Sequence, residues 1–293
     1  MVPVIARRTP AASRGFTLVE LLVGVVLGGV VAAALCRLLQ DSQRFYRSQA
    51  QVVGVQQGLR AVAHVLASEL RELDARDGDL VAIGPDSVTI RAQRTFAVVC
   101  APPDPDGGSV VLADVLTFET REPDPARDRA LVLADGERGE ASAEADEWLD
   151  FGVAGVSAGK VCADGSPGTS VRLAGDVAAL ARVPAGAPVR TYERTTYRLY
   201  ADEDGIAWLG ERHLTSAAWS ALSPVAGPLS RGDGLAFAWR DSAGTEVTTP
   251  AAVSQVDIVV RGLSNEPISI PGRRATGRRY FDSLGVHVAL RNN

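Results

Sequence analysis

Residues 14–36 of the chain read RGFTLVELLVGVVLGGVVAAALC, and this stretch decides how the rest of the sequence is organised. After the glycine, residues 16–36 are apolar apart from Thr17 and one charged residue, Glu20. A helix needs roughly 20 such residues to cross the hydrocarbon core of a membrane. Arginines precede the run, which predicts an N-terminus in the cytoplasm and the rest of the chain outside. We therefore expect a transmembrane helix that ends at about residue 36.

Glu20 is the unusual residue of this segment. A carboxylate within a membrane-spanning helix costs about 2.5–3.5 kcal/mol on insertion scales, so it usually has a partner or a task. One alternative is purely structural: Glu20 lies close enough to the helix end to reach the lipid headgroups. The neighbouring Gly15 and Phe16 favour a task, because the combined pattern is similar to a known processing signal.

The stretch resembles the N-terminal signal of type IV pilins and pseudopilins. In that family, prepilin peptidase cuts a short basic leader after the glycine, and the new N-terminal phenylalanine is methylated. The resemblance implies cleavage between Gly15 and Phe16, with residues 1–15 removed as the leader. It also implies that Glu20 attracts the terminal amine of a neighbouring subunit during filament assembly. Such pairing offsets the cost of burying both charges.

The apolar run leads into a helical pattern, and residues 16–74 are predicted to form one long helix. Apolar residues recur every three or four positions, at 52, 55, 59, 62, 66, 70 and 73, which is the spacing of one helix face. Gly54 and Gly58 each lower helix propensity by about 1 kcal/mol. We therefore expect bending or local melting near a glycine pair. The first half is expected to lie in the membrane or a filament core, and the second to pack on a globular domain.

Residues 75–293 are predicted to form an exported, β-rich globular head. Short runs of β-branched and aromatic residues predict strands near 80–83, 87–90, 95–100, 110–112, 115–118, 195–200, 235–239, 256–260 and 286–290. Hairpin turns are expected at 202–205 and 241–244. Residues 123–147 are acidic and poor in large apolar side chains, which predicts a mobile insertion. The expected fold class is α+β and pilin-like, a long N-terminal helix packed on a mainly antiparallel β domain.

The C-terminal region extends the resemblance. A strand pair containing Phe237 and Trp239, a Val-Asp-Ile-Val-Val strand and a closing strand before Arg291-Asn292 resemble large minor pilins. PilW-like minor pilins and J-type minor pseudopilins of type II secretion often end in this way, and the chain length favours the PilW-like group. The resemblance implies a non-enzymatic subunit that initiates or caps a filament for motility, adhesion, DNA uptake or secretion. Implied partners are prepilin peptidase, other major and minor pilins or pseudopilins, and the inner-membrane assembly platform.

The same resemblance implies a location: a single-pass inner-membrane protein with a cytoplasmic N-terminus and a periplasmic head, later part of a filament. The formal net charge of −5 argues against a phosphate-binding surface, so nucleic acid is not an expected partner. The basic cluster at 273–279 is the local exception. We interpret it as a solvated loop, with a patch for DNA or for a partner's carboxylate as the alternative.

Three cysteines have different expected roles. Cys36 lies at the end of the predicted span and is read as a small apolar residue. Cys100 and Cys162 are the pair available in the exported part, where oxidation is permitted, so a disulfide between them is predicted. It is expected to hold the acidic insertion against the sheet. A redox role is not predicted, because the sequence has no Cys-x-x-Cys motif.

An anchored, exported hydrolase or binding domain is the alternative from a different class. Residues 155–159 read GVSAG and match the Gly-x-Ser-x-Gly nucleophile elbow, but the following residues cannot begin the required helix. We therefore interpret the motif as a turn between strands and predict no catalytic residues. The three histidines are too scattered for a metal site, so no metal or cofactor is predicted. Acidic turns such as 202–204 could bind Ca²⁺, although turn chemistry alone explains them.

Overall fold

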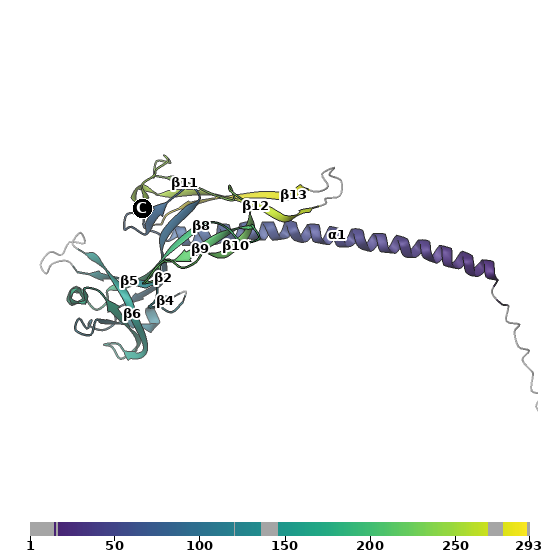
Figure 1. Ribbon diagram of the computed structural model, residues 1–293. Helices are drawn as coiled ribbons and strands as arrows, with labels where there is room; N and C mark the ends of the chain where they lie inside the picture. The colour runs from purple at the N-terminus through teal and green to yellow at the C-terminus, as the bar shows by residue number, and fades with distance from the viewer. Residues whose placement is uncertain (1–14, 16, 120, 136–145, 269–277, 292–293) are drawn as a thin grey trace, which may run out of the picture. The chain divides into compact units, whose positions relative to one another are not determined.

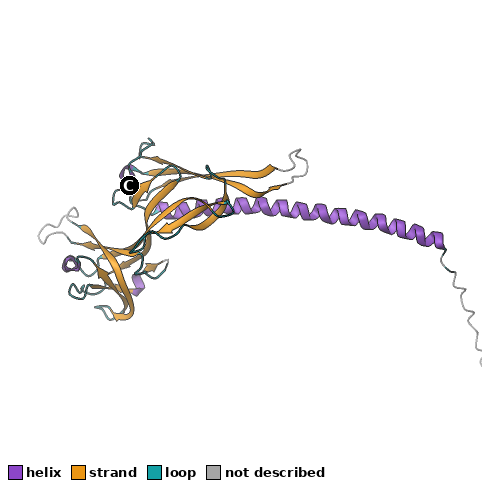
Figure 2. Cartoon of the chain, viewed as in Figure 1, coloured by secondary structure: helices purple, strands orange, loops and turns teal. Residues whose placement is uncertain are grey.

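The computed structural model describes residues 15, 17–119, 121–135, 146–268 and 278–291 (Figure 1). The chain divides into two compact units, which are described separately. The first comprises residues 1–50 and 268–278, and its described part is chiefly the first section of helix α1. The second comprises residues 51–267 and 279–293 and holds the rest of α1 with the β-structure, which Figure 2 shows in orange.

Helix α1 (Leu18–Arg71) is 54 residues long, which corresponds to about 80 Å. It is close to the predicted range, and it runs without a break through Gly54 and Gly58. Of the two expected effects, bending or local melting, the unbroken helix therefore contradicts the melting. At its C-terminal end, the carbonyl of Arg71 accepts a hydrogen bond of 3.0 Å from the backbone N–H of Arg291. The end of the chain thus satisfies one of the carbonyls that a helix terminus leaves unpaired.

One face of the second section of α1 is buried, as the spacing predicted. Its buried residues are Val55, Gly58, Leu59, Val62, Ala63, Leu66 and Leu70. This section lies between strands β10 (Ser223–Leu229) and β12 (Gln255–Ile268) (Figure 1). Glycines permit the close approach on both sides: a Cβ at Gly58 would overlap the carbonyl of Gly227, and a Cβ at Gly262 would crowd Val55.

The larger sheet contains ten strands among the described residues. Its main path runs β1-β2-β8-β5-β6-β7-β3, with β4 on β2, β9 on β8 and β10 on β9. Neighbouring strands are antiparallel, for example β2 with β8 and β8 with β9. The bounds are β1 (Leu80–Ile83), β2 (Ser87–Val98), β3 (Ser109–Ala113), β4 (Phe118–Glu119), β5 (Asp128–Ala134), β6 (Glu147–Val161), β7 (Pro167–Ala174), β8 (Pro188–Ala201) and β9 (Ala207–His213).

Strands β2 and β8 are long, and each contributes to both halves of the head. Residues 189–193 of β8 pair with β5, whereas residues 195–201 pair with β9. The half next to α1 shares a core with the helix, which includes Leu66, Ile90 and Leu209. In the other half, β2, β8, β5, β6, β7 and β3 form a closed barrel, because an isolated bridge joins Val99 to Leu112. This barrel encloses a second core, in which Leu180 is completely buried.

The smaller sheet has the order β11-β12-β13, with β11 (Leu235–Arg240) and β13 (Arg278–Ala289) on either side of β12. Backbone hydrogen bonding joins it to the larger sheet, since the N–H of Phe237 donates to the carbonyl of Pro85. Three short 3₁₀ helices are described: η1 (Asp114–Leu116), η2 (Val177–Arg182) and η3 (Pro250–Ala252). Turns form at both predicted hairpin positions, with the N–H of Gly205 bonded to Asp202 and that of Gly244 bonded to Asp241.

The prediction of a mobile insertion at 123–147 is wrong for residues 128–134. These residues form β5, which pairs with β6 and β8 near the middle of the larger sheet. The apolar run at residues 130–134, ALVLA, is the strand signal, and it was overlooked because the residues around it are acidic. Residues 136–145 lie outside the described residues. Strands β6, β7, β9 and β10 were not predicted, and the strand predicted at 115–118 is chiefly η1 with the short β4.

Candidate functional site

The first turn of α1 is built around Thr17. The backbone N–H of Glu20 donates a hydrogen bond of 3.2 Å to Thr17 Oγ1, and Thr17 Oγ1 also lies 3.4 Å from Glu20 Oε2. The carbonyl of Thr17 accepts the N–H of Leu21 at 3.1 Å. Thr17 is therefore the N-cap of the helix, and it forms a capping arrangement with the glutamate three residues later.

Glu20 consequently has a local structural role beside its predicted assembly role. Its carboxylate is exposed and lies in the first turn of the helix, where a negative charge is favoured by the helix dipole. An exposed carboxylate in this position can accept hydrogen bonds from an amine. The capping role was missed at the sequence level, although the Thr-x-x-Glu spacing at residues 17–20 is its usual signal.

The predicted cleavage position lies immediately before this cap. Gly15 is exposed, and no atom lies within 4 Å of a Cβ built at this residue. Phe16 lies outside the described residues. Helix α1 begins at Leu18, so Gly15 lies before it in the chain.

The helix section that follows presents apolar side chains to its surroundings. Within Leu18–Ala50 of the described chain no residue is buried. An 18-residue window here has a mean hydropathy of 2.5, and by length and composition the helix is able to cross a membrane. Large exposed residues include Leu18, Val19, Leu21, Leu22, Val25, Leu27, Val30 and Leu35. An apolar helix of this kind near the N-terminus fits a membrane anchor.

A comparison with known families identifies this segment. Residues 10–35 match the family model for the prokaryotic N-terminal methylation motif. The match includes Gly15, Phe16 and Glu20 and covers less than a tenth of the chain. No curated protein and no solved structure matches the chain. The motif supports a type IV pilin-like or pseudopilin subunit, which implies processing by prepilin peptidase and assembly with other pilins.

The two cysteines predicted to pair are joined in the structure. Cys100 and Cys162 form a disulfide with an S–S distance of 2.04 Å. Cys100 follows β2 at the barrel closure and bonds through its N–H to the carbonyl of Val111, while Cys162 follows β6. The disulfide thus links the end of β2, where the barrel closes, to the turn between β6 and β7. It does not hold residues 123–147 against the sheet, as was expected. Cys36 is a free and exposed cysteine.

A buried group of charges lies where β2 and β8 pass from one core to the other. Glu193 of β8 is 3% exposed, and its carboxylate lies 2.5 Å from Arg94 Nε, 3.2 Å from Arg121 and 3.3 Å from His213 Nδ1. Arg94 also contacts Glu69 of α1 at 2.9 Å. The network therefore connects the helix to the strands. It was not predicted, because its members are scattered along the chain.

The electrostatics of this network follow from burial and pairing. Burial by itself raises the pKa of Glu193, but the hydrogen bond and charge of Arg94, together with the charges of His213 and Arg121, leave the pKa lowered. For Glu69, burial is the larger effect, so its pKa is raised despite the nearby Arg94. Arg121 is held on the other side by Asp128 through two contacts of 2.6 Å. The arrangement is a structural anchor, since each carboxylate is engaged by guanidinium groups.

The other residues weighed in the sequence take structural positions. Ser157 lies within β6 and pairs with Ser170 of β7, so the Gly-x-Ser-x-Gly stretch is neither a nucleophile elbow nor the expected turn. His287 contacts Asp257 at 2.8 Å on β12. Asp202 accepts the indole N–H of Trp208, which lowers its pKa. In the described part of the chain, no group of three or more potential ligands could hold a metal ion.

Proposed function

We propose that the chain is a minor pilin or minor pseudopilin, a low-copy subunit that initiates or caps a type IV pilus or related filament. The observation that carries the proposal is the methylation motif at residues 10–35, placed directly before a long apolar helix. In this proposal prepilin peptidase cuts between Gly15 and Phe16, and the inner-membrane assembly platform receives the processed chain. The large head suits a position that is not repeated at every place in a filament lattice.

The proposed role of Glu20 is to pair with the terminal amine of a neighbouring subunit. Cleavage after Gly15 would release an ammonium group close to Thr17 and the first turn of α1. The exposed Glu20 carboxylate is available for such a charge, since its hydrogen bond within the described residues is with Thr17 Oγ1. Pairing of the two charges would set the register between subunits.

Intact mass measurement and N-terminal sequencing of the protein purified from its own membranes test the processing step. We expect a chain that starts at N-methylated Phe16. A chain that still starts at Met1, in cells with an active prepilin peptidase, would contradict the proposal. An anchored, exported hydrolase is the alternative function. Ser157 does not support it, because this residue lies within strand β6 and not at a strand-to-helix turn.

The assembly role of Glu20 needs variants that separate its charge from its capping contact. Glu20→Gln keeps a capping side chain at the third helical position but removes the charge. Thr17→Ala removes the cap and keeps the charge, at a cost of about 1 kcal/mol in helix stability. We expect Glu20→Gln and Glu20→Ala to insert into membranes normally and to be depleted from filaments. Normal incorporation of Glu20→Gln, with depletion of Thr17→Ala, would show that capping is the role of this segment.

A further inference from the structure

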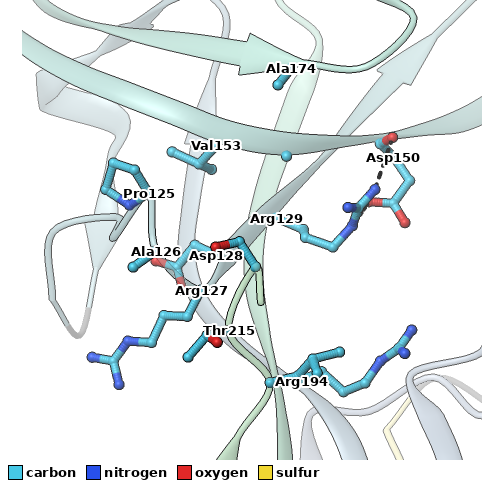
Figure 3. A pocket seen from close by; sticks show the side chains of 13 residues that line it. Pro125, Ala126, Arg127, Asp128, Arg129, Asp150, Val153, Ala174, Arg194 and Thr215 are labelled. Carbon is cyan, nitrogen blue, oxygen red and sulfur yellow. Dashed lines mark hydrogen bonds and ion pairs between the residues drawn. The ribbon is translucent and has the colours of Figure 1, made fainter. Parts of the chain in front are cut away.

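The division of the larger sheet creates a hollow in the head. At Arg194, β8 changes its partner from β5 to β9, and the two branches separate. A cavity of about 560 Å³ opens at this point (Figure 3). We call it the notch; it is lined by the 125–127 loop, the 214–216 segment and side chains of β5, β6 and β8. Cavities of this size commonly hold ligands, and they often lie between structural units.

Three arginines line the notch, but two of them are already paired. Arg129 donates to Asp150 at 2.9 Å, as the dashed line in Figure 3 shows. Arg127 contacts Asp124 at 3.1 Å and Glu193 at 3.4 Å. In contrast, the side chain of Arg194 makes no hydrogen bond or ion pair within the described parts of the chain. In the view of Figure 3, Arg129 and Arg194 extend to the same side of the notch.

The carboxylates of the notch do not neutralise Arg194. Asp128 is fully buried and engaged by Arg121. Asp150 is shared between Arg129 and the hydroxyl of Tyr192, which donates to it at 2.9 Å. The notch therefore carries one uncompensated guanidinium on a chain whose formal net charge is −5. Ser216 also lines the notch and adds a hydroxyl that can donate a hydrogen bond.

We propose that the notch binds a carboxylate side chain of an acidic peptide segment from another protein. The planar fork of Arg194 matches a carboxylate with two parallel hydrogen bonds. A polyanion such as nucleic acid is less suited, because a single free guanidinium neutralises one charge and the remaining chain is acidic. This site is separate from the N-terminal segment, and the inference does not depend on the proposed filament role.

The test uses the full chain in neutral detergent micelles and a fluorescently labelled tetraglutamate peptide at low ionic strength. Fluorescence anisotropy is measured for the unchanged protein, for Arg194→Gln and for Arg198→Gln. Arg198 is the matched control: it lies on the same strand, is exposed and does not line the notch. We expect Arg194→Gln to weaken binding at least about tenfold, as loss of a charged hydrogen bond does, and Arg198→Gln to leave it within about twofold.

Further comparisons make the result decisive. Arg194→Lys should restore part of the affinity, because it returns the charge without the fork. Thermal unfolding followed by circular dichroism checks that each variant is folded. Equal weakening by Arg194→Gln and Arg198→Gln would overturn the proposal, as would equal binding of a tetraglutamine peptide. Tighter binding of a single-stranded oligonucleotide of the same charge would also overturn it and would assign the notch to nucleic acid.

Discussion

The two sections of α1 are both rich in apolar residues, yet they are built for different surroundings. Over residues 18–36 apolar side chains cover almost the whole circumference, and no residue of Leu18–Ala50 is buried by the protein. From residue 51 to Arg71 the apolar residues occupy one face, and that face is buried between two sheets. Apolar content alone therefore does not reveal what covers a helix. The distribution of apolar residues around the helix axis is more informative. Apolar residues on all sides indicate a helix surrounded by lipid or other helices, whereas apolar residues on one face indicate packing on a protein core.

The same contrast holds for the two acidic residues that matter on this helix. Glu20 is exposed, and its contacts are with the N-cap Thr17. Glu69 is largely buried and pairs with Arg94 at 2.9 Å. The first carboxylate is available for a partner outside the chain, whereas the second is used to fasten the helix to the head. Matched substitutions should therefore change the stability of the head in the second section and leave it unchanged in the first.

The largest effect is expected for leucine truncation. Leu66 is completely buried in the core beside the helix, so Leu66→Ala should lower the free energy of unfolding of the head by about 2–5 kcal/mol. Leu27→Ala, in the exposed section, should leave it unchanged. Denaturant unfolding of the full chain in detergent, followed by tryptophan fluorescence, measures both. Equal losses would mean that the first section also belongs to the folding unit of the head.

A similar contrast is expected among the cysteines. Replacing Cys100 and Cys162 together with alanine should cost about 2–4 kcal/mol, since the bond closes a long loop. The residues are 62 positions apart. Cys36→Ala should not change the stability of the head. The same unfolding measurement under non-reducing conditions checks both. A stability unchanged by the double substitution would show that the barrel closure holds without the bond.

The glycines of the second section provide a finer test. Gly58→Ala should destabilise the head by about 1–3 kcal/mol, because the added methyl overlaps the carbonyl of Gly227. Gly54→Ala meets no atom within 4 Å and should stabilise the helix by about 0.5–1 kcal/mol. Thermal unfolding by circular dichroism distinguishes the two. If both substitutions were stabilising, the close packing of α1 against β10 would be wrong.

The smallest effect is expected from the pH dependence of Glu69. Its pKa is raised in the folded protein by burial, so its contribution to stability is fully present below the unfolded pKa of about 4.3 and declines as pH rises through the folded value. Glu69→Gln should thus cost more near pH 4 than near pH 7. Unfolding curves at the two pH values test this, with Glu20→Gln as a control for which the head stability should not change. A cost that grew with pH would contradict the assignment.

Sequence patterns predicted the helix and its buried face well, and part of the sheet. The three- and four-residue spacing of Leu59, Val62 and Leu66 is a local signal that needs no knowledge of the partner strand. Strand β5 was missed although residues 130–134 read ALVLA, an apolar run in which all residues except Leu133 are buried. The acidic residues on both sides of this run led to the interpretation of 123–147 as a single insertion. The charge on Asp128 becomes buried only because Arg121 neutralises it.

The sequence by itself determined the apolar span and the methylation motif, because membrane spans and processing signals are contained in consecutive residues. The helix cap at Thr17 is encoded just as locally, but it was recognised only in the structure. Gly15, Thr17, Glu20 and the apolar run are all contained in one short stretch. Only the tertiary structure decided the barrel, the Glu193 network and the notch. Each of them joins residues that are distant in the chain, such as Glu69, Arg94 and Glu193. Their contacts depend on the pairing of long strands, and no local pattern encodes which strands will pair.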